Sequence, residues 1–192
     1  MRAAFVTLAG EGTRLLAGSI MKFGGPLADA PIWAFGDNPQ IPGTESFHLD
    51  VPEKLNGYMF ARKAAACAAA ESMAAGDYDT LIWASPDCLV INPPVLYMLE
   101  PPFGAALRPV HIRNIGVQVG NPPDAFWQRV HEVAGTPGFT VETFVEGQEI
   151  QAYFNSHAFS VNPKLGLMSR WLEIFGKLAS DKGFQAGACA DD

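Results

Sequence analysis

The chain of 192 residues is poor in cysteine, in basic residues and in long apolar runs. Its three cysteines, Cys67, Cys88 and Cys189, are widely spaced without zinc-ligand spacing, which favours a reducing, cytoplasmic setting. Lys and Arg number 13 against 20 Asp and Glu, so the net charge of −7 argues against nucleic acid as a partner. No apolar run approaches the roughly 20 residues of a membrane helix, so we expect no membrane span.

What remains is a composition typical of a well-packed globular protein. Apolar residues make up 48% of the chain and charged residues 17%, which excludes a disordered protein. The length suits a single domain over residues 1–192 with one full core. The chain ends on Asp191 and Asp192 without a recognisable stop signal, so we expect a C-terminally truncated piece of a longer protein. The oligomeric state stays open, and a homo-oligomer is compatible with the sequence.

Segments that favour strands alternate with segments that favour helices. The expected strands are residues 3–9, 30–35, 46–49, 81–84, 104–110 and 153–161. The expected helices are residues 14–23, 56–75, 93–99, 122–134 and 164–179, with Thr13 as the N-cap of the first. Residues 114–120 are expected to be extended and residues 135–147 to form a loop. This alternation predicts an α/β fold with a mostly parallel central sheet flanked by helices on both faces.

The chain is organised around residues 79–94. Residues 81–84 are apolar without polar alternation, which indicates a strand buried on both faces in the middle of a sheet. Pro86 ends that strand, so Asp87 is expected just beyond its carboxyl end, where open α/β sheets bind ligands. A second apolar run at residues 88–91 is expected to be buried as well. The alternative interpretation makes Asp87 a turn residue that caps a short helix near Pro93.

Four segments, taken in this order, resemble GT-A type glycosyltransferases of the nucleotide-diphospho-sugar transferase fold, in particular family 8-like members. They are the strand at residues 5–8 with the helix at residues 15–20, then Tyr58, Arg62 and Lys63 on one helix, then residues 81–90, and last residues 152–163. The third resembles the family's strand that ends in Asp-x-Asp. The fourth resembles the family's tyrosine–phenylalanine–asparagine strand, although His157 stands where the family commonly has glycine.

The resemblance implies transfer of a sugar from a nucleotide-diphosphate donor to an unknown acceptor. In the family, Asp-x-Asp holds a divalent cation on the diphosphate, and Mn²⁺ or Mg²⁺ prefers oxygen ligands. Here Ser85 and Pro86 replace the first two positions and only Asp87 remains. Three outcomes stay open: weak metal binding at Asp87, metal-free catalysis with Lys63 or Arg62 on the diphosphate, or loss of transfer activity.

The resemblance also implies roles for residues at other strand ends. Thr7 and Asp37 would contact the nucleotide, and Ser85 would lie beside the diphosphate. Asn155 and Ser156 would line the sugar or acceptor side and take part in catalysis. The structural alternatives are a backbone-bonded hydroxyl at Ser85 and internally bonded polar groups at the other strand positions. For Arg62 and Lys63 the alternative is a solvated helix face.

A second resemblance leads to another enzyme class. Residues 9–15 are similar to the glycine-rich loop of sugar-nucleotide pyrophosphorylases, whose backbone N–H groups and arginine hold a triphosphate. The expected proline after Leu15 is absent. A sugar-phosphate nucleotidyltransferase is therefore one alternative function. A degenerate, non-catalytic domain that only binds a nucleotide sugar is the other.

Overall fold

The computed structural model describes residues 1–37, 40–58, 60–74, 76–110, 119–120, 122–136 and 138–181. The chain groups into two compact units. The first unit holds Met1–Ala106 and His157–Leu172, and the second holds Leu107–Ser156 and Glu173–Asp192. The expectation of a single domain over residues 1–192 stays a prediction.

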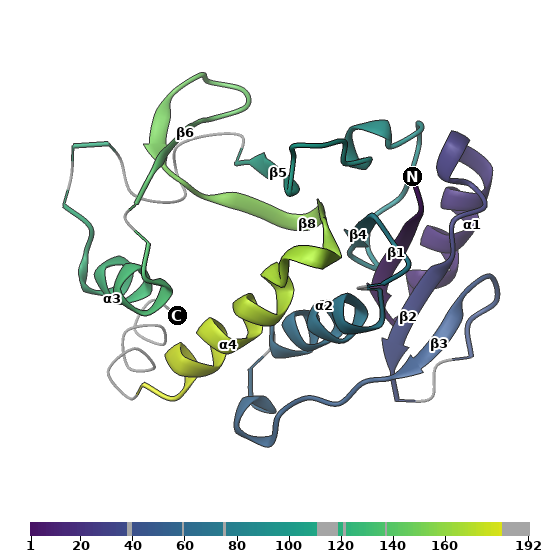
Figure 1. Ribbon diagram of the computed structural model, residues 1–192, viewed down its shortest axis with the longest axis horizontal. Coiled ribbons are helices and arrows are strands. Elements are labelled where there is room, and N and C mark those ends of the chain that lie inside the picture. Colours follow the sequence, from purple (N-terminus) through teal and green to yellow (C-terminus); the bar gives the residue numbers. More distant parts are fainter. Residues whose placement is uncertain are drawn as a thin grey trace. The chain divides into compact units, whose positions relative to one another are not determined.

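A six-stranded sheet forms the framework, in the order β3-β2-β1-β4-β8-β5 (Figure 1). β1 pairs in parallel with β2 and β4, β2 pairs in parallel with β3, and β8 runs antiparallel to β4. The predicted mostly parallel sheet is therefore confirmed, with one antiparallel partner beside the central strand. The strands are β1 Ala3–Leu8, β2 Ile32–Gly36, β3 Glu45–His48, β4 Thr80–Ala84, β5 Ala105–Pro109 and β8 Phe154–Val161.

One face of the sheet is covered by α2 (Ala61–Ala74) and by the start of α4 (Leu167–Ala179). The alanines of α2 are small, so the helix packs closely on Trp33, Phe35 and Trp83 of the sheet. Met168 and Trp171 of α4 pack against the same cluster.

The other face is covered by α1 (Thr13–Phe23), whose Leu16 and Ile20 are fully buried against Phe5, Ile32 and Ile82. Helices on both faces of the sheet are thus confirmed. Single 3₁₀ turns lie at Gly25–Leu27, Glu53–Leu55, Val95–Tyr97 and Pro163–Leu165. Among the residues that the structure describes, no helix has the length and apolar character needed to cross a membrane.

The second unit contains α3 (Ala125–Ala134) and a two-stranded antiparallel sheet. Asp124 caps α3 by accepting the backbone N–H of Trp127 at 2.9 Å, and Gly135 ends it with a left-handed φ of 67°. The small sheet joins β6 (Thr140–Glu142) to β7 (Glu149–Gln151). The expectation of a loop over residues 135–147 is wrong where β6 forms. Residues 114–118 of the expected extended piece lie outside the described residues.

Two expectations for the first helix are wrong. Thr13 is not the N-cap but the first residue of α1. Its Oγ1 accepts the Gly10 N–H and donates to the Leu8 carbonyl oxygen, both at 2.9 Å, so the hydroxyl closes the preceding turn. The sequence pattern places Leu15 on the same face of this helix as Leu16 and Ile20, but Leu15 is 66% exposed.

The second apolar run is buried only in part: Cys88 and Val90 pack against the core, whereas Leu89 and Ile91 do not. Leu89 is 60% exposed and Ile91 is 74% exposed. The run follows the end of β4, beyond the sheet, and lies between Pro86 and Pro93, which cannot donate to a strand ladder. The expectation of a helix over residues 93–99 is wrong, because only the turn Val95–Tyr97 forms there.

Candidate active site at the carboxyl edge of the sheet

The carboxyl ends of three parallel strands meet at one edge of the first unit. β1 ends at Leu8, β2 at Gly36 and β4 at Ala84, and all three run in the same direction. The segments that follow them are residues 9–12, Asp37 and residues 85–87. Because ligands of open α/β sheets bind at this edge, these segments form the candidate site.

The turn after β1 packs directly on the turn after β4. A Cβ atom added to Gly12 would overlap the carbonyl oxygen of Pro86, and one added to Gly10 would lie 3.7 Å from the Pro86 Cβ. Glycine at position 12 is therefore required by the close approach of two backbones. The sequence showed the glycines but not their contact with Pro86.

The turn that carries Asp87 is held by one backbone hydrogen bond to β8 and by one within the turn itself. The N–H of Ser85 donates to the His157 carbonyl oxygen at 2.8 Å, and the Cys88 N–H donates to the Ser85 carbonyl oxygen at 2.9 Å. Asp87 itself is exposed. The place of His157 beside Ser85 follows from the antiparallel pairing of β8 with β4, a direction that the residue pattern does not encode.

Lys63 lies under this turn, on the face of the sheet that α2 covers. Its side chain is buried, and its Nζ lies 5.5 Å from the Trp83 ring centroid and 5.7 Å from that of Phe60. Burial lowers the pKa of Lys63, and electrostatic interactions with Cys67, Asp87 and Cys88 offset part of that effect. The expected alternative of a solvated helix face is therefore wrong for Lys63.

Arg62 and Asp37 form an ion pair with each other. Arg62 Nη1 lies 3.7 Å from Asp37 Oδ2, and both side chains are largely exposed. The pair joins the start of α2 to the end of β2. An exposed pair of this kind contributes at most about 1 kcal/mol to stability, so both groups stay accessible to a ligand.

The remaining predicted site residues have different surroundings. Thr7 has no exposed surface, and its hydroxyl donates to the Leu8 carbonyl oxygen at 3.4 Å. Ser85 is half-buried. Asn155 and Ser156 lie in the part of β8 that belongs to the second unit, where Asn155 is half-buried and Ser156 exposed. The ligand contacts assigned to all four residues stay predictions.

Metal ligands are sparse in the described part of the chain. None of the described residues form a group of three or more His, Cys, Asp or Glu side chains arranged to hold a metal ion. Asp87 is the one carboxylate of its turn. A hard cation here would therefore need ligands from the substrate, as Mg²⁺ commonly takes from phosphate groups.

The residues after Asp87 line a cavity of about 260 Å³ on the α1 side of the sheet. Its walls are mostly apolar and include Ala84, Cys88, Val90 and Tyr97. Burial, followed by the nearby charge of Asp87, raises the pKa of the Cys88 thiol. Cys88 is thus a neutral wall residue at neutral pH rather than a nucleophile.

The sheet order, the two covered faces and the site at the carboxyl edge define a class of fold. The fold is of the GT-A type that glycosyltransferases share. No protein-family model matches the chain, and no curated protein sequence matches it.

The structure of this chain is similar to a solved structure of core-mannan synthase A (CmsA/Ktr4) from Aspergillus fumigatus, in its Mn/GDP form. It matches 96% of this chain with a TM-score of 0.55 and 11% sequence identity. This chain covers 65% of that protein, less than two thirds of its length. Such low identity shows the fold alone.

Two looser matches have TM-scores below 0.5 and add nothing to the fold assignment. The galactosyltransferase LgtC, in complex with donor and acceptor sugar analogues, matches 91% of this chain and 61% of its own at a TM-score of 0.45 and 15% identity. A 4-diphosphocytidyl-2C-methyl-D-erythritol synthase from Anaerococcus prevotii matches 90% of this chain over 77% of its own length, with a TM-score of 0.45 and 6% sequence identity.

Proposed function

We propose that the chain transfers a sugar from a nucleotide-diphosphate donor to an acceptor, at the carboxyl edge of β1, β2 and β4. One observation carries the proposal: the turn holding Gly12 packs on the turn holding Asp87, with the Lys63 amine buried beneath. A backbone turn at a helix start, a cation and a carboxylate thus converge at the edge where such sheets bind ligands.

The charges suit a diphosphate. The start of α1, an 11-residue helix, carries the positive end of the helix dipole and lies directly after the glycine turn. Lys63 adds a cation in a poorly hydrated place, where its attraction to a phosphate is stronger than in water. These groups would stabilise negative charge as the diphosphate leaves the sugar.

Asp87 would serve as the single protein carboxylate for Mn²⁺ or Mg²⁺ that arrives with the donor. Bound there, such a cation would supply further neutralisation of the departing diphosphate. Ser85 would lie next to it, and Arg62 with Asp37 would face the nucleotide.

Calorimetry with a panel of nucleotide-diphosphate sugars and Mn²⁺ tests the proposal. We expect one donor to bind and Asp87→Ala to weaken its binding about 10-fold or more, because the cation loses its protein ligand. Asp77→Ala is the matched control, since Asp77 is an exposed carboxylate near the other end of β4. Binding of no donor, or equal binding by the wild type and Asp87→Ala, contradicts the proposal.

The glycine turn supports a second candidate, a sugar-phosphate nucleotidyltransferase, because its backbone lies at the start of α1 where a triphosphate could be held. Release of pyrophosphate from a nucleoside triphosphate and a sugar phosphate would identify that activity. Binding of a nucleotide sugar without any turnover would instead identify a degenerate binding domain.

A further inference from the structure

A second cavity lies at the opposite edge of the sheet from the candidate active site. Its volume is about 430 Å³, within the range of small-molecule sites. Met1 precedes β1, Asp79 precedes β4, and Asn162 follows the antiparallel β8, so these cavity residues lie at the amino edge. All residues that line the cavity belong to the first unit.

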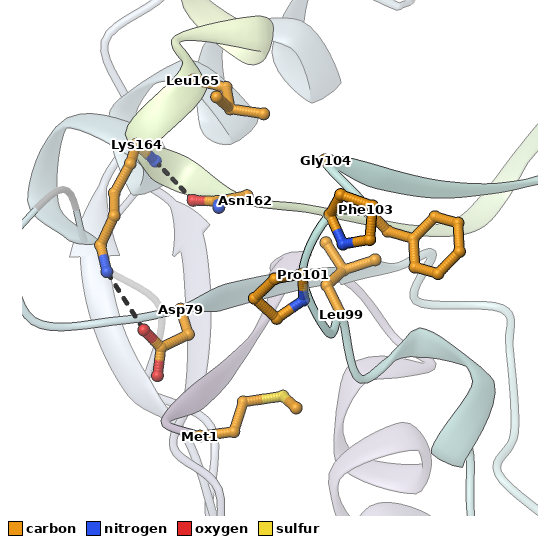
Figure 2. A pocket seen from close by; sticks show the side chains of 10 residues that line it. Met1, Asp79, Leu99, Pro101, Phe103, Gly104, Asn162, Lys164 and Leu165 are labelled. Atoms are coloured by element: carbon orange, nitrogen blue, oxygen red, sulfur yellow. Dashed lines mark hydrogen bonds and ion pairs between the residues drawn. The ribbon is translucent and has the colours of Figure 1, made fainter.

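The cavity has one polar wall and one apolar wall, as Figure 2 shows. Lys164 Nζ lies 3.1 Å from Asp79 Oδ1 on the polar side, and both side chains are about half exposed. The Asn162 Oδ1 accepts the Lys164 N–H at 3.0 Å. Leu99 and Phe103 lie across from them, with Phe103 67% exposed.

The polar wall offers donors and an acceptor side by side. The Lys164 ammonium keeps donors beyond its bond to Asp79, and the Asn162 amide adds two more. Asp79 stays ionised, because the Arg2 backbone N–H and then Lys164 lower its pKa. A hydroxyl group, which donates and accepts, can bridge such a carboxylate and ammonium, and a ring with several hydroxyls can bridge several such groups.

Lys164 and Asp79 contribute one charge of each sign and are paired with each other, and the N-terminal amino group of Met1 also acts on Asp79. The paired side chains therefore present hydrogen-bonding groups to a hydroxylated ligand. The apolar wall, with its exposed Phe103 ring, suits the C–H face of a saturated ring. A neutral ligand with a polar rim and an apolar face fits both walls.

We propose that this cavity, bounded by the Asp79–Lys164 ion pair, Asn162 and Phe103, binds a neutral sugar of one or two rings. The site is separate from the carboxyl edge, and the proposal does not depend on transferase activity. It assigns the ion pair to ligand recognition, with Leu99 and Phe103 as the surface on which the ring lies.

An NMR titration of the full chain with neutral disaccharides such as maltose, lactose and cellobiose tests the proposal. Saturable shifts are expected for the amides of Gly104, Lys164 and Leu165 and for the Asn162 side-chain NH₂ group. Shifts that do not saturate, or that centre on the carboxyl edge, overturn the proposal.

Variants separate recognition from folding. Lys164→Gln and Asp79→Asn should each weaken sugar binding about 10-fold, the loss expected for a hydrogen bond to a charged group. Phe103→Ala removes an exposed ring and should weaken binding without lowering the melting temperature. Lys177→Gln is the matched control, since Lys177 forms a similarly exposed ion pair with Glu173. Equal affinity in the wild type and in all three cavity variants would overturn the proposal.

Discussion

At the scale of one residue, Lys63 is a charged group buried inside the fold, next to the proposed diphosphate site. Its amine is buried on the α2 face, beneath the turn of Asp87, and burial is the main cause of its lowered pKa. Burial of a charged group costs hydration free energy, which contacts within the fold and a bound anion can both offset. Our interpretation is that the diphosphate of the proposed donor is one such anion.

Replacement of Lys63 by methionine tests this interpretation. Lys63→Met keeps the length of the side chain and removes a charge that loses hydration on folding, so we expect the free energy of unfolding to change by no more than about 1 kcal/mol. Binding of the nucleotide-diphosphate donor should weaken about 10-fold. Urea denaturation and calorimetry measure the two effects. A variant that is less stable and binds the donor normally would show that Lys63 is a structural residue.

The difference in stability between the wild type and Lys63→Met should also depend on pH. The pKa of Lys63 is lowered in the folded state from its ordinary value of 10.5, so between the two values the unfolded chain holds more protons. The stability of the wild type relative to Lys63→Met should therefore rise with pH through the lowered folded pKa. A constant difference across that interval would contradict the burial of a charged amine.

At the scale of an element, the start of α1 depends on one glycine. The Gly12 backbone lies against the Pro86 carbonyl oxygen, which is not a flexible group that can move aside. Gly12→Ala should therefore displace the turn, lower the free energy of unfolding by about 2 kcal/mol and weaken donor binding.

Gly18 supplies the control within the same helix. It lies in the interior of α1, and a Cβ added there has open space. Gly18→Ala should stabilise the protein by about 0.5 kcal/mol, because alanine loses less backbone entropy than glycine in a helix. Thermal unfolding of both variants makes the comparison, and equal effects would refute the close contact at Gly12.

The junction of α2 and α4 depends on one buried carboxylate. Glu71 is 2% exposed and accepts the Met168 N–H at 2.9 Å, the Ser169 N–H at 2.8 Å and the Ser169 hydroxyl at 2.7 Å. It thereby satisfies backbone donors at the start of α4. This contact was not predictable from local pattern, because Glu71 and Met168 lie 97 positions apart in the chain.

Glu71→Ala should cost about 3 kcal/mol, because it leaves those donors buried without an acceptor. Glu173→Ala removes an exposed carboxylate of α4 that pairs with Lys177 and should change stability by less than about 0.5 kcal/mol. Urea denaturation of the two variants measures the difference. Similar small losses in both would show that Glu71 does not hold the helix start.

At the scale of the whole molecule, the sequence predicted what local patterns encode. Apolar runs identified the buried strands β1, β2 and β4, and Pro86 placed Asp87 beyond the sheet edge. The resemblance to GT-A type enzymes predicted a fold that the structure confirms.

Other features depend on contacts between distant segments and were not predictable from local pattern. Leu89 and Ile91 in the run at residues 88–91 are apolar yet exposed, because burial depends on neighbours rather than on the composition of the run itself. Burial of Lys63 depends on how α2 packs on Trp83. The hairpin of β6 and β7 consists of strands of three residues each, too short for an alternating pattern to be distinct.

On the proposed function, the carboxyl edge of β1, β2 and β4 receives a nucleotide diphosphate with its cation. Paramagnetic broadening of backbone amide NMR signals by Mn²⁺, added with a nucleoside diphosphate, tests it most directly, with Mg²⁺ as the diamagnetic control. We predict the strongest broadening at residues 10–12, Asp37 and residues 85–88. Broadening centred elsewhere on the described chain, such as around Asp79, or no broadening beyond that of Mn²⁺ alone, would contradict the claim.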